Sequence, residues 1–481
     1  MTTTAMRPSA RGRTGTVGRS ASVRRRLKFQ GDLLGTAGTA VVVGSIALWT
    51  NGGGIHTMAA LGGVATSLGR LTGLVASAML LLQVLMMARI PWVERVWGQD
   101  QLARRHRWIG FGSFNLMIAH IVLITIGYAQ AAGVNILGQA WDLVINYPGM
   151  LLATAGTVAI LLVAFSSMKR ARRKLRYESW HLLHLYAYVG VGLALPHQLW
   201  TGKDFLSSTF ATVFWWTLWA AAAGAILIFR VGLPIVRSLR HRIVVSAVVP
   251  ESPGVWSVVM TGRRLDRLGL QAGQFCQWRF LSGKGWTRAH PYSVSADPTA
   301  DRIRITIKVL GDGSAVAPSL PVGTRVVIEG PYGVMTADRR NRRDVLMIGA
   351  GIGITPMRAL AERIVREEPS EDLGTRRPPQ VTVLHRIPNW ADGTFAEEFN
   401  QLSAWSNLRV VPLVGHRVPG GSFFPGPERV DPVWALTSLV PDVADREVYL
   451  CGPRPFMTQV RTTLGAAGVD PANIHAEEFG W

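Results

Sequence analysis

Cysteine is scarce in this chain, since only Cys276 and Cys451 occur among its 481 residues. Two thiols cannot build a disulfide framework, an iron–sulfur cluster or a structural zinc site, so the sequence excludes proteins that depend on these features. Both cysteines lie in the second half of the chain. We expect this half to occupy a reducing compartment.

Charged residues are scarce over one long stretch. Residues 33–232 are dominated by apolar runs, whereas residues 240–481 have the mixed polarity of a globular protein. Within the apolar stretch, six segments have the length of about 20 residues that is needed to cross a bilayer core roughly 30 Å thick. We therefore predict a membrane all-α six-helix bundle over residues 31–235, with spans at 33–50, 67–88, 107–129, 148–168, 180–200 and 209–232.

Lys and Arg are nearly absent from three of the connections between these spans. The other two connections, 89–107 and 169–176, are densely basic. The positive-inside rule then places the basic connections, both chain termini and the second half of the chain in the cytoplasm of a multi-pass plasma-membrane protein. The alternation of basic loops with apolar spans also argues against nucleic acid as a partner, despite a net charge of +21. The poorly basic connections are 51–66 and 130–147, which have none, and 201–208, which has only Lys203.

Residues 1–30 lack the apolar core and small-residue cleavage site of a signal peptide. They are rich in Ser, Thr, Gly and Arg. Such a composition is typical of a disordered segment, and its arginines can touch anionic lipid. We predict a disordered basic tail over residues 1–30.

Four histidines lie in two of the apolar spans at nearly equal spacings. His106 and His120 are 14 residues apart, and His184 and His197 are 13 apart. Each gap corresponds to about 20 Å along a helix. Both spans run outward from the cytoplasm, so His106 matches His184 in depth and His120 matches His197. Imidazole is an axial ligand of haem iron, and ionisable side chains at membrane depth usually mark function. We therefore predict two b-type haems, each held by one pair.

The angular positions of the histidines suit one span better than the other. A 14-residue gap returns to within about 40° of the same helix face, whereas a 13-residue gap misses it by about 140°. Pro196, directly before His197, can distort that helix. His181, one turn from His184, remains an alternative inner ligand. The basic residues next to the inner pair are candidates to bind haem propionates: Arg104, Arg105 and Arg107.

Residues 240–337 are rich in short strand patterns. Alternating runs at 243–249, 255–260, 275–280, 303–309 and 325–329 predict a small antiparallel β-barrel. One motif on it is His290-Pro291-Tyr292-Ser293-Val294-Ser295, whose tyrosine can lie along a flavin ring and whose serine hydroxyl can reach flavin N5 or O4. A second is Ile307-Lys308-Val309-Leu310-Gly311-Asp312-Gly313-Ser314, whose turn can present backbone N–H groups to a diphosphate.

Residues 340–481 alternate strand and helix patterns. This predicts an α/β doubly wound parallel sheet with its ligand at the carboxyl ends of the strands. The strand at 344–350 leads into Gly351-Ile352-Gly353-Ile354-Thr355-Pro356 and a helix. A glycine-rich loop in this place lets backbone amides hold a pyrophosphate. Further strands are expected at 380–385, 408–413 and 447–451, and the last of them ends in Cys451-Gly452-Pro453.

Over residues 67–481 the chain resembles the ferric reductase and NADPH oxidase superfamily, in which a six-helix haem domain is fused to a ferredoxin–NADP reductase-like module. The two histidine spacings match that family's two-haem pattern. His290-Pro291-Tyr292-Ser293 resembles its His-Pro-Phe-Thr flavin motif, although Tyr and Ser are closer to the soluble reductases. The segment from Gly349 to Pro356 resembles its nicotinamide loop, and Cys451-Gly452-Pro453 resembles the turn beside the nicotinamide. The C-terminal Glu477-Glu478-Phe479-Gly480-Trp481 resembles the aromatic cover of the flavin, which is either Trp481 or Phe479.

The resemblance implies that cytoplasmic NAD(P)H reduces FAD, and that electrons then pass singly through the inner and outer haems to an acceptor outside the membrane. It assigns Ser293, Cys451 and the terminal aromatic to the hydride step. We expect oxygen as the acceptor, giving superoxide, and the alternatives are a ferric chelate or a membrane or protein partner. The outer loops hold only scattered candidate ligands for iron: His56, Asp142 and Asp204. A transporter with a nucleotide-sensing domain is a further hypothesis, which predicts no haem.

The choice between NADPH and NADH depends on a basic side chain near the nucleotide. Arg386 follows the expected strand at 380–385, where its guanidinium can pair with a 2′-phosphate. Arg358 is a second candidate. On this basis we predict NADPH, with NADH as the alternative.

Overall fold

The computed structural model describes residues 17–168, 171, 177–283, 286–311, 313–367, 377–416, 422–426 and 430–478. Backbone contacts group the chain into two compact units. The first, Gln30–Val231, is helical and is called the helical unit. The second, Gly232–Trp481, with which the chain before Gln30 is grouped, contains the described strands and is called the sheet unit.

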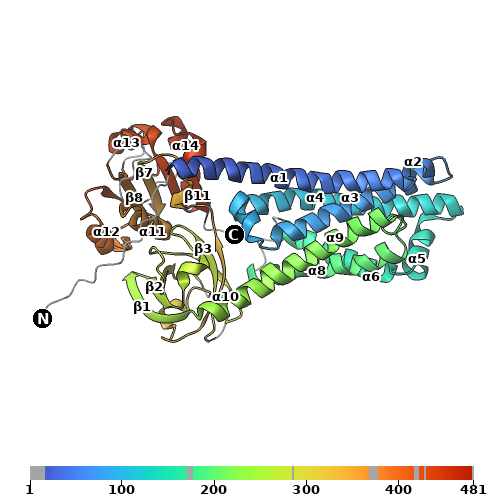
Figure 1. The fold of residues 1–481 in the computed structure, drawn as a ribbon, viewed down its shortest axis with the longest axis horizontal. Coiled ribbons are helices and arrows are strands. Elements are labelled where there is room, and N and C mark those ends of the chain that lie inside the picture. The colour runs from blue at the N-terminus through green and yellow to red at the C-terminus, as the bar shows by residue number, and fades with distance from the viewer. Residues whose placement is uncertain are drawn as a thin grey trace. The chain divides into compact units, whose positions relative to one another are not determined.

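Long apolar helices make up the helical unit (Figure 1). Among the described residues, five helical segments are long and apolar enough to cross a membrane: those in α1, α3, α4 and α6, and the run from α9 through α10. The span expected at 180–200 lies in α8, which is not among these five segments. The helices are α1 (Val17–Asn51), α2 (Gly54–Thr57), α3 (Gly63–Met87), α4 (Pro91–Ala132), α5 (Ile136–Asn146), α6 (Met150–Ser167), α8 (Tyr177–Trp200), α9 (Thr209–Ala225) and, after the π-helix Ile226–Gly232, α10 (Leu233–His241).

Two segments that were expected to lie outside the helices are helical in the structure. The disordered tail was expected to reach residue 30, but α1 begins at Val17; residues 1–16 lie outside the described part of the chain. Arg, Lys, Leu and Gln are good helix formers, so an apolar helix extends readily into this basic segment. The basic connection 89–107 lies largely within α4, which begins with Pro91 in its first turn and has one non-helical residue, Gly98, with a φ of 71°.

Glycines let the helices that carry the histidines approach their neighbours closely. A Cβ at Gly69 of α3 would lie 2.9 Å from the backbone nitrogen of Ile124 in α4. A Cβ at Gly156 of α6 would lie 2.7 Å from the carbonyl oxygen of Gly190 in α8. Small residues are typical of such contacts in membranes, because close packing holds the helices together there. Thus α4 packs on α3, and α8 packs on α6.

Two three-stranded antiparallel sheets form the first part of the sheet unit (Figure 1). Their strand orders are β1-β2-β5 and β4-β3-β6. A bridge between Val294 and Ile305 joins them. Alternate side chains point into one core, in which Val258 and Trp278 are fully buried. The strands lie at the ranges expected for them, with β4 in addition: β1 (Val244–Ser252), β2 (Val255–Thr261), β3 (Phe275–Phe280), β4 (His290–Ser293), β5 (Arg302–Lys308) and β6 (Val326–Tyr332).

A five-stranded parallel sheet of order β11-β10-β7-β8-β9 forms the second part. Val345 and Met347 of β7 face one core together with α11, while Leu346 and Ile348 face another together with α14. Burial on both faces is typical of parallel sheets. The winding reverses between β7 and β10, where doubly wound sheets bind their ligands. The elements are β7 (Val345–Ala350), α11 (Ile354–Val365), β8 (Val381–Ile387), α12 (Ala396–Leu402), β9 (Leu408–Val414), α13 (Pro432–Leu439), β10 (Glu447–Gly452), α14 (Arg454–Ala466) and β11 (Ile474–Glu478).

Candidate functional site

Two pairs of histidines face each other inside the helical unit, and in each pair one ring comes from α4 and the other from α8. The ring centroids of His106 and His184 are 6.0 Å apart, with the ring planes at 64°. Those of His120 and His197 are 6.5 Å apart, with the planes at 41°. The structure therefore brings together the residues that were matched by depth.

Helix α8 carries both of its histidines and continues without a break to Trp200, with Pro196 inside it. Both pairs form although the two sequence spacings differ by one residue. Gly149 packs against this part of α8, since a Cβ there would lie 2.7 Å from the backbone nitrogen of His197. The side chain of His181, the alternative inner ligand, lies outside the described residues.

Neighbouring helices hold the rings in place. The Nδ1 atom of His120 lies 2.8 Å from the carbonyl oxygen of Gly69 in α3. Gly73, one turn further along α3, packs on the same ring, since a Cβ there would lie 2.5 Å from Nδ1. At the other pair, Oγ of Ser167 in α6 lies 3.4 Å from Nδ1 of His184, and the ring of Trp180 in α8 lies 5.1 Å from the ring of His184. His120 and His184 are thus held by contacts other than those with their paired rings.

The spacing of the rings fits one metal ion between two imidazoles. With bonds of about 2 Å to each ring nitrogen and roughly 1 Å from nitrogen to ring centre, two axial imidazoles have centroids about 6 Å apart. The Nδ1 atom of His106 is buried without a hydrogen-bond partner among the described residues, so the protein alone does not satisfy this polar atom. The donor set, two neutral imidazoles for each ion, is one that haem iron accepts.

The expected flavin motif lies on β4, at the edge of its sheet. Ser293 is buried, and its Oγ has no hydrogen-bond partner among the described residues. Burial raises the pKa of the Tyr292 hydroxyl to about 12, so that hydroxyl stays protonated. The tyrosine ring stacks with His290 at a centroid distance of 6.0 Å, and a Cβ at Gly313 would lie 2.5 Å from the histidine ring. An unpartnered buried hydroxyl beside an aromatic ring fits a flavin, whose N5 and O4 can bond a hydroxyl.

Other residues of the two flavin motifs have structural positions. Val294 and Ile307 are buried in the apolar core. The hydroxyl of Ser295 is taken, because it accepts hydrogen bonds from Arg304 Nε at 3.1 Å and from Thr306 Oγ1 at 2.8 Å. Pro291 is exposed on β4. Among these four residues, the sequence pattern did not distinguish core from surface.

The turn expected to hold a diphosphate is partly closed by its own serine. Ser314 Oγ accepts hydrogen bonds from the backbone N–H groups of Leu310, at 2.9 Å, and Gly311, at 3.2 Å. These two N–H groups are therefore not available to a phosphate, contrary to the expectation. Serine hydroxyls commonly bond the nearby backbone in turns. Lys308 is half-buried at the end of β5, and Asp312 lies outside the described residues.

The glycine-rich loop after β7 packs tightly on the end of β10. Gly351 has a φ of 53°, in the left-handed region that favours glycine. A Cβ at Gly353 would lie 2.4 Å from the carbonyl oxygen of Cys451. Burial lowers the pKa of the nearby His385 to about 4, so its imidazole, with Nε2 3.3 Å from the Gly351 oxygen, is neutral.

The start of α11 completes this loop. A Cβ at Gly349 would lie 3.1 Å from the Ile354 nitrogen, so the chain turns tightly from strand to helix. Thr355 Oγ1 donates a hydrogen bond of 2.7 Å to the Ile352 carbonyl, and Pro356 lies in the first helical turn. Backbone amides at such a helix start form an anion site, which fits the pyrophosphate of a dinucleotide.

A carboxylate to which the sequence pattern gave no role lies beside the buried thiol. Cys451 of β10 pairs in register with Glu477 of β11. Burial raises the pKa of the Cys451 thiol, and the Glu477 carboxylate adds to this effect, so the thiol stays protonated. Gly452 ends β10 and Pro453 precedes α14. Glu477 was part of the C-terminal motif, but only the strand register shows that it lies next to Cys451.

Both arginines proposed for a 2′-phosphate are held by the protein itself. Arg386 donates to five backbone carbonyls, among them Phe423 O at 2.8 Å and Leu413 O at 3.1 Å. Arg358 is buried between the carboxylates of Glu362 and Glu398. In this structure both guanidinium groups are engaged within the protein, and a role of either at a 2′-phosphate stays a prediction. The two candidates for the flavin cover, Phe479 and Trp481, lie outside the described residues.

Comparison with known families connects the two parts of the chain. A family model described as Ferric reductase like transmembrane component matches residues 72–195, a range that contains His106, His120 and His184 and ends just before His197. A second, described as Oxidoreductase NAD-binding domain, matches residues 347–462, which contain the loop after β7 and Cys451. The chain has the domain fusion of the ferric reductase and NADPH oxidase superfamily. One part of the chain is thus similar to ferric reductase transmembrane components and another to oxidoreductase NAD-binding domains.

Individual relatives share about half of the chain. The ferredoxin reductase component of 3-ketosteroid-9-alpha-monooxygenase from Mycolicibacterium smegmatis is 31% identical over 244 residues, which are 49% of this chain and 64% of that protein. A flavohemoprotein from Xylella fastidiosa is 28% identical over 246 residues, 50% of this chain and 59% of its own length. The matches thus span less than two thirds of these curated relatives. The FAD/NAD-binding domain of a nitric oxide dioxygenase from Vibrio cholerae is 27% identical, with a TM-score of 0.37, covering 50% of this chain and all of that domain.

Proposed function

We propose that this protein passes electrons from cytoplasmic NAD(P)H, by way of FAD and two b-type haems, to oxygen outside the membrane. The observation that carries the proposal is the meeting of α4 and α8 at two histidine pairs, with centroids 6.0 and 6.5 Å apart. When bound, the flavin accepts a hydride and the haems carry single electrons, which is chemistry that side chains cannot supply. The protein's part is to hold these groups and to exclude competing reactions.

His106 with His184, and His120 with His197, are the residues that would hold the two haem irons. A carbonyl oxygen only accepts hydrogen bonds, so the contact of His120 Nδ1 with Gly69 O places the ring proton on Nδ1. The lone pair of Nε2 is then available to a metal. Such a second bond also fixes the orientation of a ligating imidazole and raises its basicity.

The distribution of basic residues supports the direction of transfer. The connections 89–107 and 169–176 carry most of the Lys and Arg of the membrane region, so they belong on the cytoplasmic side. His106 and His184 are the members of each span nearest to these connections. With α8 counted as the sixth span, the module that follows α9 is on the same side. Reduced nucleotide is therefore oxidised in the cytoplasm.

The groups around the nucleotide loop support hydride chemistry because they are neutral. Burial keeps the Cys451 thiol protonated, and it keeps His385 uncharged. Neither of these two groups adds a charge that would compete with the pyrophosphate for the amides at the start of α11. The unpartnered hydroxyl of Ser293 would bind and orient the flavin ring.

Oxygen is favoured as the acceptor because two of the three candidate iron ligands in the outer connections, Asp204 and Asp142, already have protein partners. Asp204 forms an ion pair of 2.5 Å with Arg70. Asp142 accepts hydrogen bonds from Gln139 at 3.2 Å and from Asn146 at 2.7 Å. A diffusible gas needs no ligand cluster, whereas a ferric chelate is held by such groups.

The acceptor is tested in inside-out membrane vesicles that are supplied with NADPH or NADH and made permeable, so that added superoxide dismutase and ferric citrate reach the extracytoplasmic face. We expect superoxide that is abolished by superoxide dismutase and is unaffected by added ferric citrate. Turnover that requires iron and ignores the dismutase would reject oxygen and favour the ferric chelate. Vesicles from cells that produce the His120→Ala variant serve as the matched control, since they keep the nucleotide site but lose an outer ligand.

A further inference from the structure

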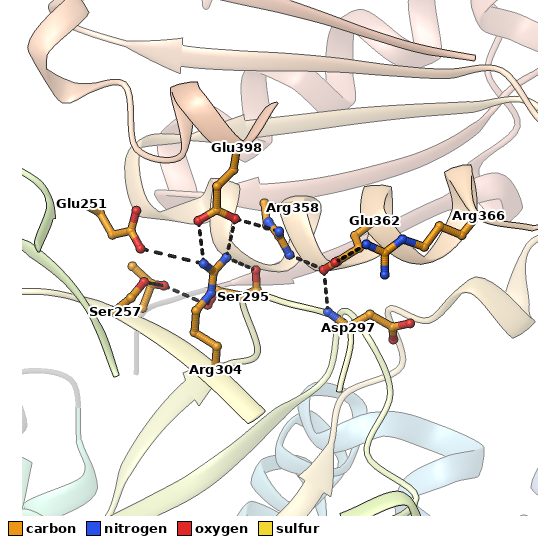
Figure 2. A network of polar contacts seen from close by, with 10 residues as sticks. Glu251, Ser257, Ser295, Asp297, Arg304, Arg358, Glu362, Arg366 and Glu398 are labelled. Atoms are coloured by element: carbon orange, nitrogen blue, oxygen red, sulfur yellow. Dashed lines mark hydrogen bonds and ion pairs between the residues drawn. The ribbon is translucent and has the colours of Figure 1, made fainter. Parts of the chain in front are cut away.

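A network of ion pairs joins the antiparallel sheets to the parallel sheet within the sheet unit (Figure 2). Arg304 of β5 makes a bidentate contact with Glu398 of α12, from Nη1 at 2.5 Å and from Nη2 at 2.9 Å. Arg358 of α11 reaches the same carboxylate with Nη2 at 2.7 Å. It also pairs with Glu362, one turn further along its own helix. The Glu398 carboxylate is therefore shared by one arginine of the antiparallel sheets and one arginine of a helix that packs on the parallel sheet.

On the antiparallel side the network holds the last residue of the flavin motif, Ser295. Arg304 donates to Ser295 twice, from Nε to Oγ at 3.1 Å and from Nη2 to the carbonyl oxygen at 2.9 Å. Thr306 and Ser257 extend the same set of hydrogen bonds across β5 and β2. Ser295 is two residues after Ser293, the buried hydroxyl that fits a flavin. The guanidinium of Arg304 thus fixes the end of the flavin strand.

On the parallel side the network holds the helix that starts at the nucleotide loop. Arg358 lies three residues after Thr355, which closes that loop. Glu362, further along the helix, accepts a hydrogen bond of 3.0 Å from the backbone nitrogen of Asp297 and pairs with Arg366 at 2.9 Å. Helix α11 is therefore connected to the flavin segment at two points. Arg358 is linked to Ser295 through Glu398 and Arg304, and Glu362 binds the backbone nitrogen of Asp297 directly.

The burial of these charges makes the arrangement specific. Arg304 and Arg358 are each only 8% exposed. A buried charge is tolerated only with its partners in place, and a bidentate arginine–carboxylate contact permits one relative orientation. Apolar packing, which also joins the two parts in one core, sets no such direction. The network is therefore suited to define the angle and the separation between the antiparallel sheets and the parallel sheet.

We propose that Arg304, Glu398 and Arg358 are positioning residues that set the flavin motif and the nucleotide loop at the separation that hydride transfer requires. This inference rests on the proposed function. The transfer moves two electrons and one proton, as a hydride, from the reduced nucleotide, which is oxidised, to the flavin, which is reduced. Its rate depends steeply on placement, because a displacement of about 1 Å can cost roughly a hundredfold.

The test compares two neighbouring glutamates of α12 in the full-length purified protein. Glu398→Gln removes the shared charge while keeping the shape of the side chain. Glu397→Gln is the matched control, because Glu397 is exposed and its carboxylate contacts Gln401, outside the network. The flavin absorbance is followed anaerobically after mixing with NADPH or NADH over a range of concentrations. Flavin content and the protection of residues 294–306 and 354–366 from hydrogen exchange, without nucleotide, are measured in parallel.

We expect Glu398→Gln to lower the limiting rate of flavin reduction by about tenfold to a hundredfold. Flavin content and the half-saturating nucleotide concentration should stay within about twofold of the wild-type values. Both peptides should exchange faster in Glu398→Gln and not in Glu397→Gln. If Glu398→Gln does not fold, Glu398→Asp, which keeps the charge on a shorter stem, should give an intermediate rate.

Two results would overturn the inference: a limiting rate in Glu398→Gln or Glu398→Asp equal to that of Glu397→Gln, or a rate loss explained fully by lost flavin. Failure of the proposed function would look different, because wild-type protein with bound flavin would then not be reduced by either nucleotide.

Discussion

The Nδ1 atom of His120 lies 2.8 Å from the carbonyl oxygen of Gly69, on the neighbouring helix α3. The bond determines the tautomer of the ring, because the carbonyl can only accept, and leaves Nε2 with a free lone pair. Gly73 packs on the same ring. One face of α3 thus holds the imidazole by a hydrogen bond and by close contact, and this gives a way to disturb the outer pair without removing a histidine.

Gly73→Ala should displace the His120 ring. The added Cβ would lie 2.5 Å from Nδ1, a separation that carbon and nitrogen atoms do not tolerate, so the ring must leave its position beside Gly73. We expect the haem content to fall from two per chain to about one, as measured by the pyridine haemochrome spectrum. Gly192→Ala in α8 is the control, since nothing lies within 4 Å of a Cβ there. Unchanged haem content in Gly73→Ala would show that the ring position does not matter for binding.

Ser293→Ala should weaken flavin binding without weakening the flavin-free protein. The Oγ atom is buried without a partner, so its removal does not cost the empty fold a hydrogen bond. It removes one bond to the bound flavin, with an expected loss of about 1 kcal/mol, or roughly fivefold in dissociation constant. Flavin titration and thermal unfolding of the flavin-free protein measure the two effects, with the exposed Ser319→Ala as control. A lower melting temperature with unchanged flavin affinity would assign Ser293 to the fold instead.

Arg386→Gln should destabilise the sheet unit and leave the nucleotide preference unchanged. The guanidinium donates to carbonyls of β8, β9 and the segment after them, and glutamine cannot reach all of these groups. Several partly buried carbonyls lose their donor, with an expected cost of about 2–4 kcal/mol. The ratio of kcat/KM for NADPH and NADH should match that of the exposed control Arg461→Gln. Normal stability together with a lost preference for NADPH would show that Arg386 is a phosphate ligand.

Asp297→Asn should stabilise the protein at neutral pH. Burial raises the pKa of Asp297 from its ordinary 3.8 to about 6, although Arg363 opposes this. Because the folded state holds its proton more tightly, this carboxyl favours folding below about pH 4, and that contribution is lost as the pH rises through 6. Removing the charge should therefore raise stability at pH 7.5 by roughly 2 kcal/mol, or about 5 °C in melting temperature. At pH 4.5 the difference should be much smaller, and an equal difference at both pH values would contradict this account.

The membrane helices and the histidine pairs were predictable because the bilayer limits what the chain can do. Apolar length and loop charge determine depth and direction, and equal depth was enough to match His106 with His184 and His120 with His197. Local patterns of strand and turn residues likewise located most of the sheet unit, since they act over a few residues.

Contacts between distant segments were not predictable in this way. The turn around Ser314 and the side chain of Arg386 were both expected to bind phosphate. Instead, Ser314 accepts hydrogen bonds within its own turn, and Arg386 donates to carbonyls of strands that are neighbours only in the fold. Glu477 lies beside Cys451 because β10 and β11 pair in parallel. Arg304 and Glu398 are 94 residues apart in sequence, and no periodic pattern predicts their contact.

The most direct test of the central claim is the haem content of the purified full-length protein and of two single variants. The dithionite-reduced spectrum of the wild type should show low-spin b-type bands and two haems per chain. His106→Ala and His120→Ala should each retain about one, with His56→Ala unchanged, since each variant breaks a different pair. A wild-type protein without b-type bands, or variants that keep both haems, would contradict the account.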